Sequence, residues 1–272
     1  NILTCPKKDY LPRPKEIEEL RILLFESRNT RIRPNLDDKI LTEWNGLMLS
    51  TLAEAALVTG REDWLEDAKT NANFLLKNLC RDDGRWYRSW QEKGGARHLG
   101  YAADHIAIAD GLLKLGEATG ESYWTNMAVK TAEVLLELFT DQENGGFFST
   151  GSDAEKLPVR PKDVFDNAHP SANSMAALTL KRLFLLTGET KFSDAADSVL
   201  RLLNTQVLNH PTAFAHLLQG LDLFYSPKNQ IVVTGNRPDF IDCPPENVSQ
   251  EELLKRVKEI KPDIVAMSIM TF

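Results

Sequence analysis

Two aspartates and two histidines lie at positions where the sequence could support proton transfer. Asp104 and His105 stand at the expected start of an apolar helix, and Asp166 and His169 lie in a polar loop before another. Histidine titrates near neutrality, so His105 and His169 could act as the acid and the base beside a carbonyl carbon. Asp104 and Asp166 could instead be the two facing carboxylates that glycoside hydrolysis needs. Both pairings are hypotheses, because lone histidines are more often packing or surface residues.

The loop over residues 160–173 carries the densest group of varied polar side chains before an apolar helix. A hydroxyl-rich ligand would need such a mixture of donors and acceptors, whereas an exposed loop would not. Ser171 or Asn173 is also expected to cap the helix that follows. Besides Asp166 and His169, the candidate ligand-binding residues of this loop are Arg160, Lys162, Asp163, Ser171 and Asn173.

A second candidate group lies around the run Trp44-Asn45-Gly46, which opens a predicted helix. Asn45 could hydrogen-bond a ligand hydroxyl while Trp44 stacks on the face of a sugar ring. The alternative is that Asn45 caps the helix and Trp44 fills the core. Asp37 and Lys39 lie just upstream, where they could contact the same ligand or form a surface ion pair.

Three segments, 46–76, 105–139 and 174–203, repeat one pattern that must position these residues. Each has an apolar helix, a Thr-Gly pair, a few polar residues, an aromatic residue and a second apolar helix. Apolar residues recur three and four apart within each helix, and the long repeat is typical of stacked helical hairpins. The glycines expected to end the first helices are Gly60, Gly120 and Gly188, and the aromatics expected to wedge between paired helices are Trp64, Trp124 and Phe192.

The links between the hairpins favour a closed toroid over an open solenoid. Residues 81–90 and 141–150 each have Asp and Gly followed by paired aromatics, which predicts short β-hairpins. Solenoid repeats usually have shorter links. With further helices at 14–27 and 212–225, we predict an all-α fold: a partial, six-hairpin glycosidase-like (α/α) toroid over residues 1–235. A complete ring has twelve helices, so we expect two more hairpins upstream.

The remaining residues read differently. An apolar run at 230–234 predicts a strand. After it, Phe240-Ile241, a periodic run at 249–260 and an apolar run at 263–270 predict a strand, a helix and a further strand. We therefore expect a short α/β tail over residues 236–272, with a strand–helix–strand order, that is truncated or foreign to the toroid.

Three linker motifs resemble the YyaL-type family, which includes spermatogenesis-associated protein 20. They are DDKILTEWNGLMLSTLAEA at 37–55, GYAADHIAIADGLLKL at 100–115 and VRPKDVFDNAHPSANSMAAL at 159–178. The resemblance covers roughly residues 1–235. It implies a toroid akin to N-acylglucosamine 2-epimerases and six-hairpin glycosidases, attached to a thioredoxin-like domain that is absent from this sequence. That domain is the expected partner, and no redox activity is carried over.

The tail resembles the start of the cobalamin-binding domain found ahead of radical S-adenosylmethionine enzymes. That domain's Asp-x-His-x-x-Gly motif is missing from the tail, so we expect no cobalamin. No Gly-rich phosphate loop and no cluster with metal-ligand spacing is present either. The sequence therefore predicts neither a metal nor another cofactor.

Composition excludes several classes of partner. The net charge is −7 without a long basic cluster, which argues against nucleic acid. No apolar window reaches the ~18 residues that would span a membrane. Three widely spaced cysteines, Cys5, Cys80 and Cys243, indicate free thiols and a reducing, cytoplasmic location.

These features predict a small, sugar-like ligand in the toroid cavity. One hypothesis is an enzyme, either a sugar isomerase or epimerase using acid–base chemistry or a glycosidase. The alternative is a non-catalytic module that binds a ligand or partner beside the thioredoxin-like domain.

Overall fold

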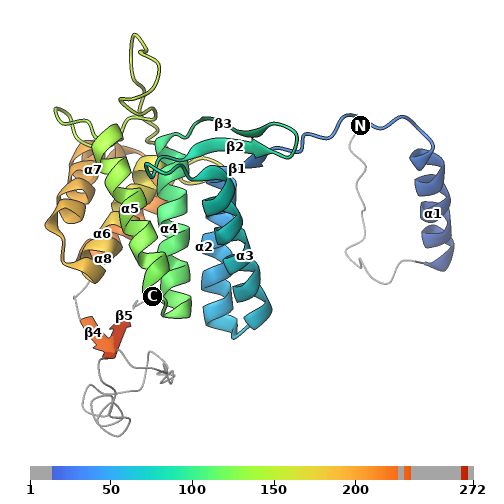
Figure 1. The fold of residues 1–272 in the computed structure, drawn as a ribbon, viewed down its shortest axis with the longest axis horizontal. Helices are drawn as coiled ribbons and strands as arrows, with labels where there is room; N and C mark the ends of the chain where they lie inside the picture. The colour runs from blue at the N-terminus through green and yellow to red at the C-terminus, as the bar shows by residue number, and fades with distance from the viewer. Residues whose placement is uncertain (1–13, 226–229, 234–264, 269–272) are drawn as a thin grey trace, which may run out of the picture. The chain divides into compact units, whose positions relative to one another are not determined.

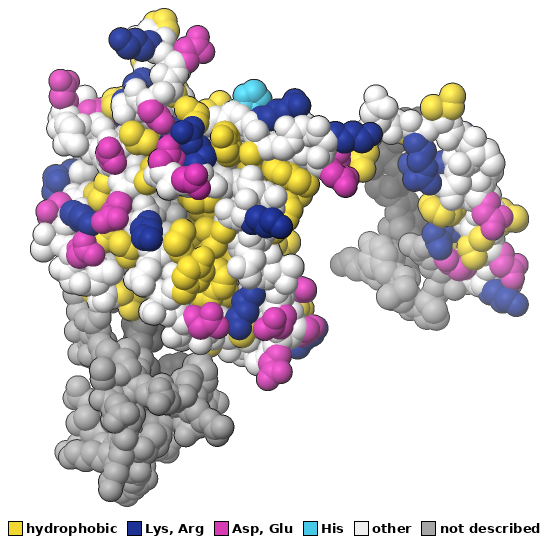
Figure 2. All heavy atoms as spheres, in the orientation of Figure 1, with side chains coloured by type: hydrophobic (Ala, Val, Ile, Leu, Met, Phe, Trp, Pro, Cys, Tyr) yellow, Lys and Arg dark blue, Asp and Glu magenta, His cyan; other side chains and the backbone are white. Residues whose placement is uncertain are grey.

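A computed structural model describes residues 14–225, 230–233 and 265–268 of the chain (Figure 1). Residues 1–38 and 39–272 form two compact units, each described by itself. The first holds helix α1 (Lys15–Asn29), which begins after Pro14 and buries none of its side chains. Its apolar residues, among them Ile17, Leu20 and Leu24, are exposed between charged ones (Figure 2).

The second unit contains the three predicted helical hairpins, and the all-α prediction is confirmed. The pairs are α2 (Thr42–Thr59) with α3 (Glu62–Leu79), α4 (Ala102–Thr119) with α5 (Ser122–Phe139), and α6 (Ala172–Thr187) with α7 (Thr190–Asn209). Gly60, Gly120 and Gly188 end the first helix of each pair with φ values of 68°, 69° and 74°. Only glycine adopts this left-handed conformation at little cost, so the three Thr-Gly pairs set the hairpin turns as predicted.

The helices form two layers (Figure 1). Helices α2, α4 and α6 lie side by side, and we call them the inner helices, while α3, α5 and α7 each pack on the inner helix of their own pair. The predicted helix at 212–225 is a 3-10 turn, η1 (Pro211–Phe214), followed by α8 (Ala215–Tyr225), which packs on α6. Within the described part of the chain, every helix is too short or too polar to span a bilayer.

Two of the three predicted aromatic wedges are buried between paired helices. Trp124 and Phe192 belong to the continuous hydrophobic core. Trp64 is only half-buried, and the Arg61 guanidinium lies 4.5 Å from the centre of its ring. In the links, Trp86 and Phe147 are fully buried, so these aromatics pack against the helices.

A small antiparallel sheet lies at the end of the layers where α2 and α4 begin (Figure 1). It consists of β1 (Ile40–Leu41), β2 (Tyr87–Gln91) and β3 (Gly95–Leu99), in that order. Strand β1 runs directly into α2, and β3 ends just before α4, so the sheet fixes where both inner helices start.

The predicted hairpin within residues 81–90 is wrong in its register. Strand β2 pairs with β3, so that Tyr87 lies opposite Leu99. The turn between the two strands is at Gly95, whose φ is 63°. Residues 81–84 form a tight turn closed by the bridge between Cys80 and Trp86. The second predicted hairpin, at 141–150, is reduced to one bridge between Thr140 and Phe147.

The strands predicted at 230–234 and 263–270 are present, and the one predicted at Phe240-Ile241 lies outside the described residues. Strand β4 (Gln230–Val233) pairs antiparallel with β5 (Val265–Ser268). The helix predicted at 249–260 lies outside the described residues, and the tail boundary at residue 236 stays a prediction.

The inner helices α2 and α4 touch through their backbones. A Cβ atom on Gly46 would lie 2.7 Å from the carbonyl carbon of Ala107 and 2.8 Å from the nitrogen of Ile108. A Cβ atom on Gly111 would lie 2.8 Å from the carbonyl oxygen of Gly46. Both glycines are therefore required by the packing of one backbone on the other, not by turn geometry.

We predict that Gly46→Ala lowers the free energy of unfolding by about 1–3 kcal/mol, because the added methyl group overpacks the contact with α4. Urea unfolding followed by circular dichroism measures the change. Gly220→Ala in α8 is the matched control, since its Cβ would meet nothing closer than 3.5 Å. That variant should be unchanged or more stable by about 0.5–1 kcal/mol. An equal loss in both variants would contradict the role of the α2–α4 contact.

Candidate functional site

Three chain segments predicted to line the cavity meet at the start of the inner helices. The backbone N–H of Glu43, at the start of α2, donates to Oδ1 of Asp104, at the start of α4, over 3.0 Å. His169, in the loop before α6, places Nδ1 3.2 Å from Oε1 of Glu43. These contacts join segments about 60 and 125 residues apart in the chain into one polar cluster, which we call the Glu43–His169 site.

Asp104 is the buried anchor of this site. Its Oδ2 accepts a 2.7 Å hydrogen bond from the N–H of Tyr101 in a capping box and lies 3.0 Å from Nη1 of Arg88 in β2. Burial raises the pKa of Asp104 to about 6, and Arg88 opposes that rise. The Arg88 guanidinium also lies 4.6 Å from the centre of the Tyr101 ring. Asp104 thus ties α4 to α2 and to β2.

Glu43 was not among the residues that the sequence predicted for the site. Its side chain is 8% exposed and lies between His169 and Arg88, whose Nη1 is 3.6 Å from Oε2. The His169 side chain is 44% exposed and reaches solvent. The pair therefore combines a buried carboxylate, that of Glu43 beside Arg88, with the solvent-accessible imidazole of His169. The sequence signal for Glu43 was its place in the family motif at 37–55, beside Trp44-Asn45-Gly46.

His105 is fully buried and does not pair with His169. Its Nδ1 lies 2.8 Å from the carbonyl oxygen of Tyr101, and its Nε2 lies 3.0 Å from Nη1 of Arg85. Arg85 can only donate, so Nε2 accepts and Nδ1 carries the proton. Burial, and then the charge of Arg85, lower the pKa of His105 to about 3. These contacts give His105 a structural role as a neutral residue, and no geometry supports it as a catalytic acid or base.

Asn173, also predicted to bind ligand, is completely buried and fully hydrogen-bonded. Its Oδ1 accepts from the N–H of Phe147 over 2.8 Å. Its Nδ2 donates to the carbonyl oxygens of Phe147 and Asp163 over 3.0 and 2.7 Å. The side chain therefore fastens two loops to the start of α6.

The carboxylates of the same loop also bind backbone groups. Asp166 accepts from the N–H of Ser171 over 2.9 Å and from that of His216 over 2.8 Å. Asp163 accepts from the N–H of Ala172 over 3.1 Å. Ser171 is the N-cap of α6, as predicted, and its hydroxyl accepts from the third helical N–H. Asp104 and Asp166 are thus both engaged in joining segments.

The two basic residues predicted in this loop bind backbone oxygens, and Lys162, which donates to the carbonyl oxygen of Gly145 over 2.6 Å, also binds a carboxylate. Arg160 donates to the carbonyl oxygen of Leu138 over 3.1 Å and to that of Thr150. Lys162 lies 2.8 Å from Oδ2 of Asp141, where it lowers the pKa of that carboxyl far below its usual range. These contacts hold the loop against the end of α5.

The segment around Trp44 is only partly as predicted. Trp44 is exposed, and Asn45 does not cap α2, because its Nδ2 donates back to the carbonyl oxygen of Leu41 over 2.8 Å. Lys39 is exposed at the start of the second unit. Asp37 belongs to the first unit, so its predicted place at the site stays a prediction.

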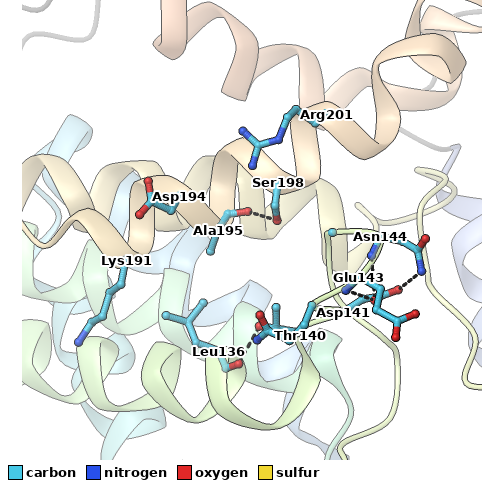
Figure 3. A pocket seen from close by; sticks show the side chains of 12 residues that line it. Leu136, Thr140, Asp141, Glu143, Asn144, Lys191, Asp194, Ala195, Ser198 and Arg201 are labelled. Atoms are coloured by element: carbon cyan, nitrogen blue, oxygen red, sulfur yellow. Dashed lines mark hydrogen bonds between the residues drawn. The ribbon is translucent and has the colours of Figure 1, made fainter.

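A separate hollow of about 540 Å³ lies between the outer helices α5 and α7 and the turn at 141–145 (Figure 3). Its walls are polar, with Lys191, Asp194 and Arg201 from α7 and Asp141 from the turn. It contains none of the predicted site residues. Among the described residues, no group of three or more His, Cys, Asp or Glu side chains is placed to hold a metal ion.

We predict a pH-dependent stability contribution from His105. Its pKa falls from 6.5 unfolded to about 3 folded, so its contribution is complete above pH 6.5 and is lost as the pH falls toward 3. The advantage of the wild type over His105→Gln in free energy of unfolding should shrink by about 2 kcal/mol between pH 6.5 and pH 5, at roughly 1.4 kcal/mol per pH unit. Urea unfolding at both pH values measures it.

The exposed His98 offers the control for this experiment. His98→Asn keeps a residue that tolerates the positive φ of 59° and removes an exposed imidazole instead of a buried one. A wild-type advantage over His105→Gln that is the same at pH 6.5 and pH 5 would contradict the neutral, buried state of His105.

Comparisons with known proteins agree with this architecture. No protein-family model matches the chain. Spermatogenesis-associated protein 20 from Rattus norvegicus is 32% identical over 237 residues, which is 81% of this chain and 30% of that protein. The predicted resemblance of the tail to a cobalamin-binding domain has no support from any comparison, and most of that tail lies outside the described residues.

Two solved structures show the fold. Cellobiose 2-epimerase from Spirochaeta thermophila aligns with a TM-score of 0.58 at 17% identity, over 71% of this chain and 55% of that one. A GH76 α-mannanase from Bacteroides thetaiotaomicron aligns with a TM-score of 0.56 at 14% identity, over 79% and 65%. These identities establish the toroid fold alone. With 32% identity over four fifths of its length, the chain belongs to the spermatogenesis-associated protein 20 family, as its motifs predicted, and spans about 30% of the length of the rat relative.

Proposed function

We propose that this toroid acts on a sugar and that Glu43 and His169 carry out proton transfer to and from it. The observation that carries the proposal is the 3.2 Å contact between Nδ1 of His169 and Oε1 of Glu43. The fold adds support, since the structures it resembles include a cellobiose 2-epimerase and an α-mannanase. Fold likeness alone does not assign a reaction, so the site must carry the argument.

The geometry suits a histidine that exchanges protons with a substrate. Because Nδ1 faces Glu43, the second ring nitrogen, Nε2, is directed away from the carboxylate. Glu43 orients the ring through its contact with Nδ1. Glu43 is itself held by Arg88 and by its backbone bond to Asp104. An oriented imidazole on a side chain that reaches solvent is the arrangement that general acid–base catalysis requires.

The proposed step is the interconversion of two sugars through an enediolate. Nε2 of His169 takes the proton from the carbon next to the carbonyl group, and the electron pair of that C–H bond forms the enediolate. In one outcome a water molecule on the opposite face protonates the same carbon, and the imidazolium gives its proton to the hydroxide that remains. In the other, the imidazolium returns its proton to the neighbouring carbon, while the hydroxyl proton of the intermediate moves to the oxygen of the original carbonyl group. The first outcome is epimerisation and the second is aldose–ketose isomerisation.

Glycoside hydrolysis by Asp104 and Asp166 is less well supported. Asp104 is completely buried, and Asp166 accepts backbone N–H groups at both carboxylate oxygens. A hydrolase needs one carboxyl group as an acid and the other free to act on water or on the sugar. Both groups already stabilise the loops, so proton transfer at His169 is the better proposal.

Ligand binding without catalysis is the second candidate. It is favoured by the predicted polar residues whose side chains bind backbone groups, among them Asn173, Asp163 and Asp166, because those groups are engaged in holding the loop. In this case the toroid would hold a sugar or partner for a thioredoxin-like domain in a longer protein. That attachment is a proposal, because the chain spans about 30% of the rat relative.

We predict that the chain exchanges the proton on the carbon next to the carbonyl group of its sugar. Incubation with mannose, glucose and cellobiose in D₂O, followed by ¹H NMR, should show deuterium entering that position. His169→Gln should slow the exchange by about 10²–10⁴-fold, because the proton acceptor is lost. Glu43→Gln should slow it while leaving the sugar bound, because the imidazolium loses its partner.

The control is His98→Asn, which changes an exposed histidine outside this site and should keep the wild-type rate. Sugar-dependent thermal stabilisation without any exchange would favour the binding module. Neither exchange nor stabilisation with any sugar would contradict the carbohydrate proposal itself.

A further inference from the structure

The hollow between α5 and α7 has the size of a small-molecule site. Its volume of about 540 Å³ lies within the roughly 300–1,000 Å³ of known ligand pockets. The facing walls are the turn at 141–145 and one stripe of α7 (Figure 3). Polar residues three or four apart share that face of the helix, namely Lys191, Asp194, Ser198 and Arg201. We call this cavity the α7 hollow.

The base of the α7 hollow is held in place by bonds within the protein. Asp141 accepts from the N–H of Glu143 over 3.0 Å, and its other carboxylate oxygen lies 2.8 Å from Nζ of Lys162. The hydroxyl of Ser198 accepts from the N–H of Gly146 over 3.2 Å, which fastens the turn to α7. The hollow is therefore preformed, and these polar groups are engaged in the fold.

Three charged side chains that line the hollow have no partner within the part of the chain that the structure describes. They are Glu143 on the turn and Asp194 and Arg201 on α7, and all three are exposed. Asp194 and Arg201 are seven residues apart, about 10 Å along the helix axis. Ion pairs within a helix join residues three or four apart, so these two do not neutralise one another.

The balance of charge in the hollow specifies the chemistry of a ligand. Lys191 adds no unpaired cation, because its Nζ lies 2.6 Å from the carboxylates of both Glu133 and Glu189. Two unpaired carboxylates and one guanidinium remain. A guanidinium binds a carboxylate through two parallel N–H groups, and a carboxylate accepts from an ammonium group. A complementary ligand therefore has one carboxylate and two cationic groups.

We propose that the α7 hollow binds a free basic amino acid such as lysine. The α-carboxylate of the ligand pairs with Arg201, and its α-ammonium group pairs with Glu143. Its extended side chain follows α7 and places the second ammonium group at Asp194. This site is separate from the Glu43–His169 site, so the proposal does not depend on the sugar chemistry proposed there.

The test titrates the full chain with L-lysine and follows the backbone amides by ¹H–¹⁵N NMR, which detects weak binding and shows whether each variant is folded. Saturable shifts should appear in the turn at 141–145 and along residues 194–201. Arg201→Gln, Asp194→Asn and Glu143→Gln should each weaken binding about tenfold, because each removes a charged hydrogen bond. Lys77→Gln is the matched control, since it removes an exposed cation from the outer helix α3, outside the hollow, and should bind like the wild type.

Analogues of lysine test each charge of the ligand separately. Norleucine lacks the side-chain ammonium group, Nα-acetyl-lysine lacks the α-ammonium group, and cadaverine lacks the carboxylate. Each should bind about tenfold more weakly than lysine, since one ion pair is lost. Equal binding of any of the three overturns the proposed arrangement, as do shifts confined to other surfaces or the absence of saturable shifts.

One further analogue covers the alternative occupant. Nα-acetyl-lysine amide resembles a lysine residue within a peptide chain, and it should bind more weakly than the free amino acid. Binding as tight as that of lysine would assign the hollow to a segment of a protein and would overturn the proposal. Deuterium exchange into sugars is measured independently, so failure at the α7 hollow is distinguishable from failure at the Glu43–His169 site.

Discussion

The close approach of α2 and α4 is the constraint on which the site depends. Their backbones touch at Gly46 and Gly111, where no Cβ atom would fit. Glu43 lies one turn before Gly46, so this contact brings its N–H within 3.0 Å of the Asp104 carboxylate. A bulkier residue at either glycine would separate the two helix starts. The position of the Glu43 side chain is therefore determined by packing farther along the same helix.

A polar tie supplements this contact farther along the inner helices. Asp110 of α4 accepts from the hydroxyls of Ser50 in α2 over 2.7 Å and Thr179 in α6 over 3.2 Å. Burial alone would raise the pKa of Asp110, but nearby Lys114 and Arg182 hold it below its ordinary value. A buried charge that loses a partner costs several kcal/mol, roughly 3–5, so sliding of one inner helix past another is strongly opposed. Steric contact and charge together fix the register of the inner layer.

The sequence predicted the helical part of the fold well because its signals are local. A Thr-Gly pair between two apolar helices specifies a hairpin wherever it occurs, and all three glycines adopt the predicted conformation. The links between the hairpins were harder to predict, because the strand register depends on which glycine forms the turn. Both Gly84 and Gly95 could form it, and the strands turn at Gly95. Glu43 was missed for a similar reason, since a glutamate in a first helical turn has an ordinary explanation in the helix dipole. Its role is visible only once His169 is brought beside it from the distant loop.

The polar residues of the 160–173 loop were interpreted as ligand contacts when much of their role is to replace secondary structure. A loop without strands or helices must satisfy its buried N–H and C=O groups with side chains. Asn173, Asp163 and Asp166 do this at three successive points. The density of varied donors and acceptors therefore marked a loop that must be held in one conformation. Such a loop is needed where an exposed residue has to stay in place.

His169 is that residue, and its position follows from Asp166. Three residues earlier in the loop, Asp166 fastens the chain to the N–H of His216 at the start of α8 and to Ser171 at the start of α6. The imidazole of His169 has Oε1 of Glu43 and the carbonyl oxygen of Pro170 within 3.2 Å of its Nδ1. Loss of Asp166 would release the loop and move the imidazole away from its carboxylate. A loss of activity on changing Asp166 would therefore not identify a catalytic carboxylate, because a positioning residue at this point has the same effect.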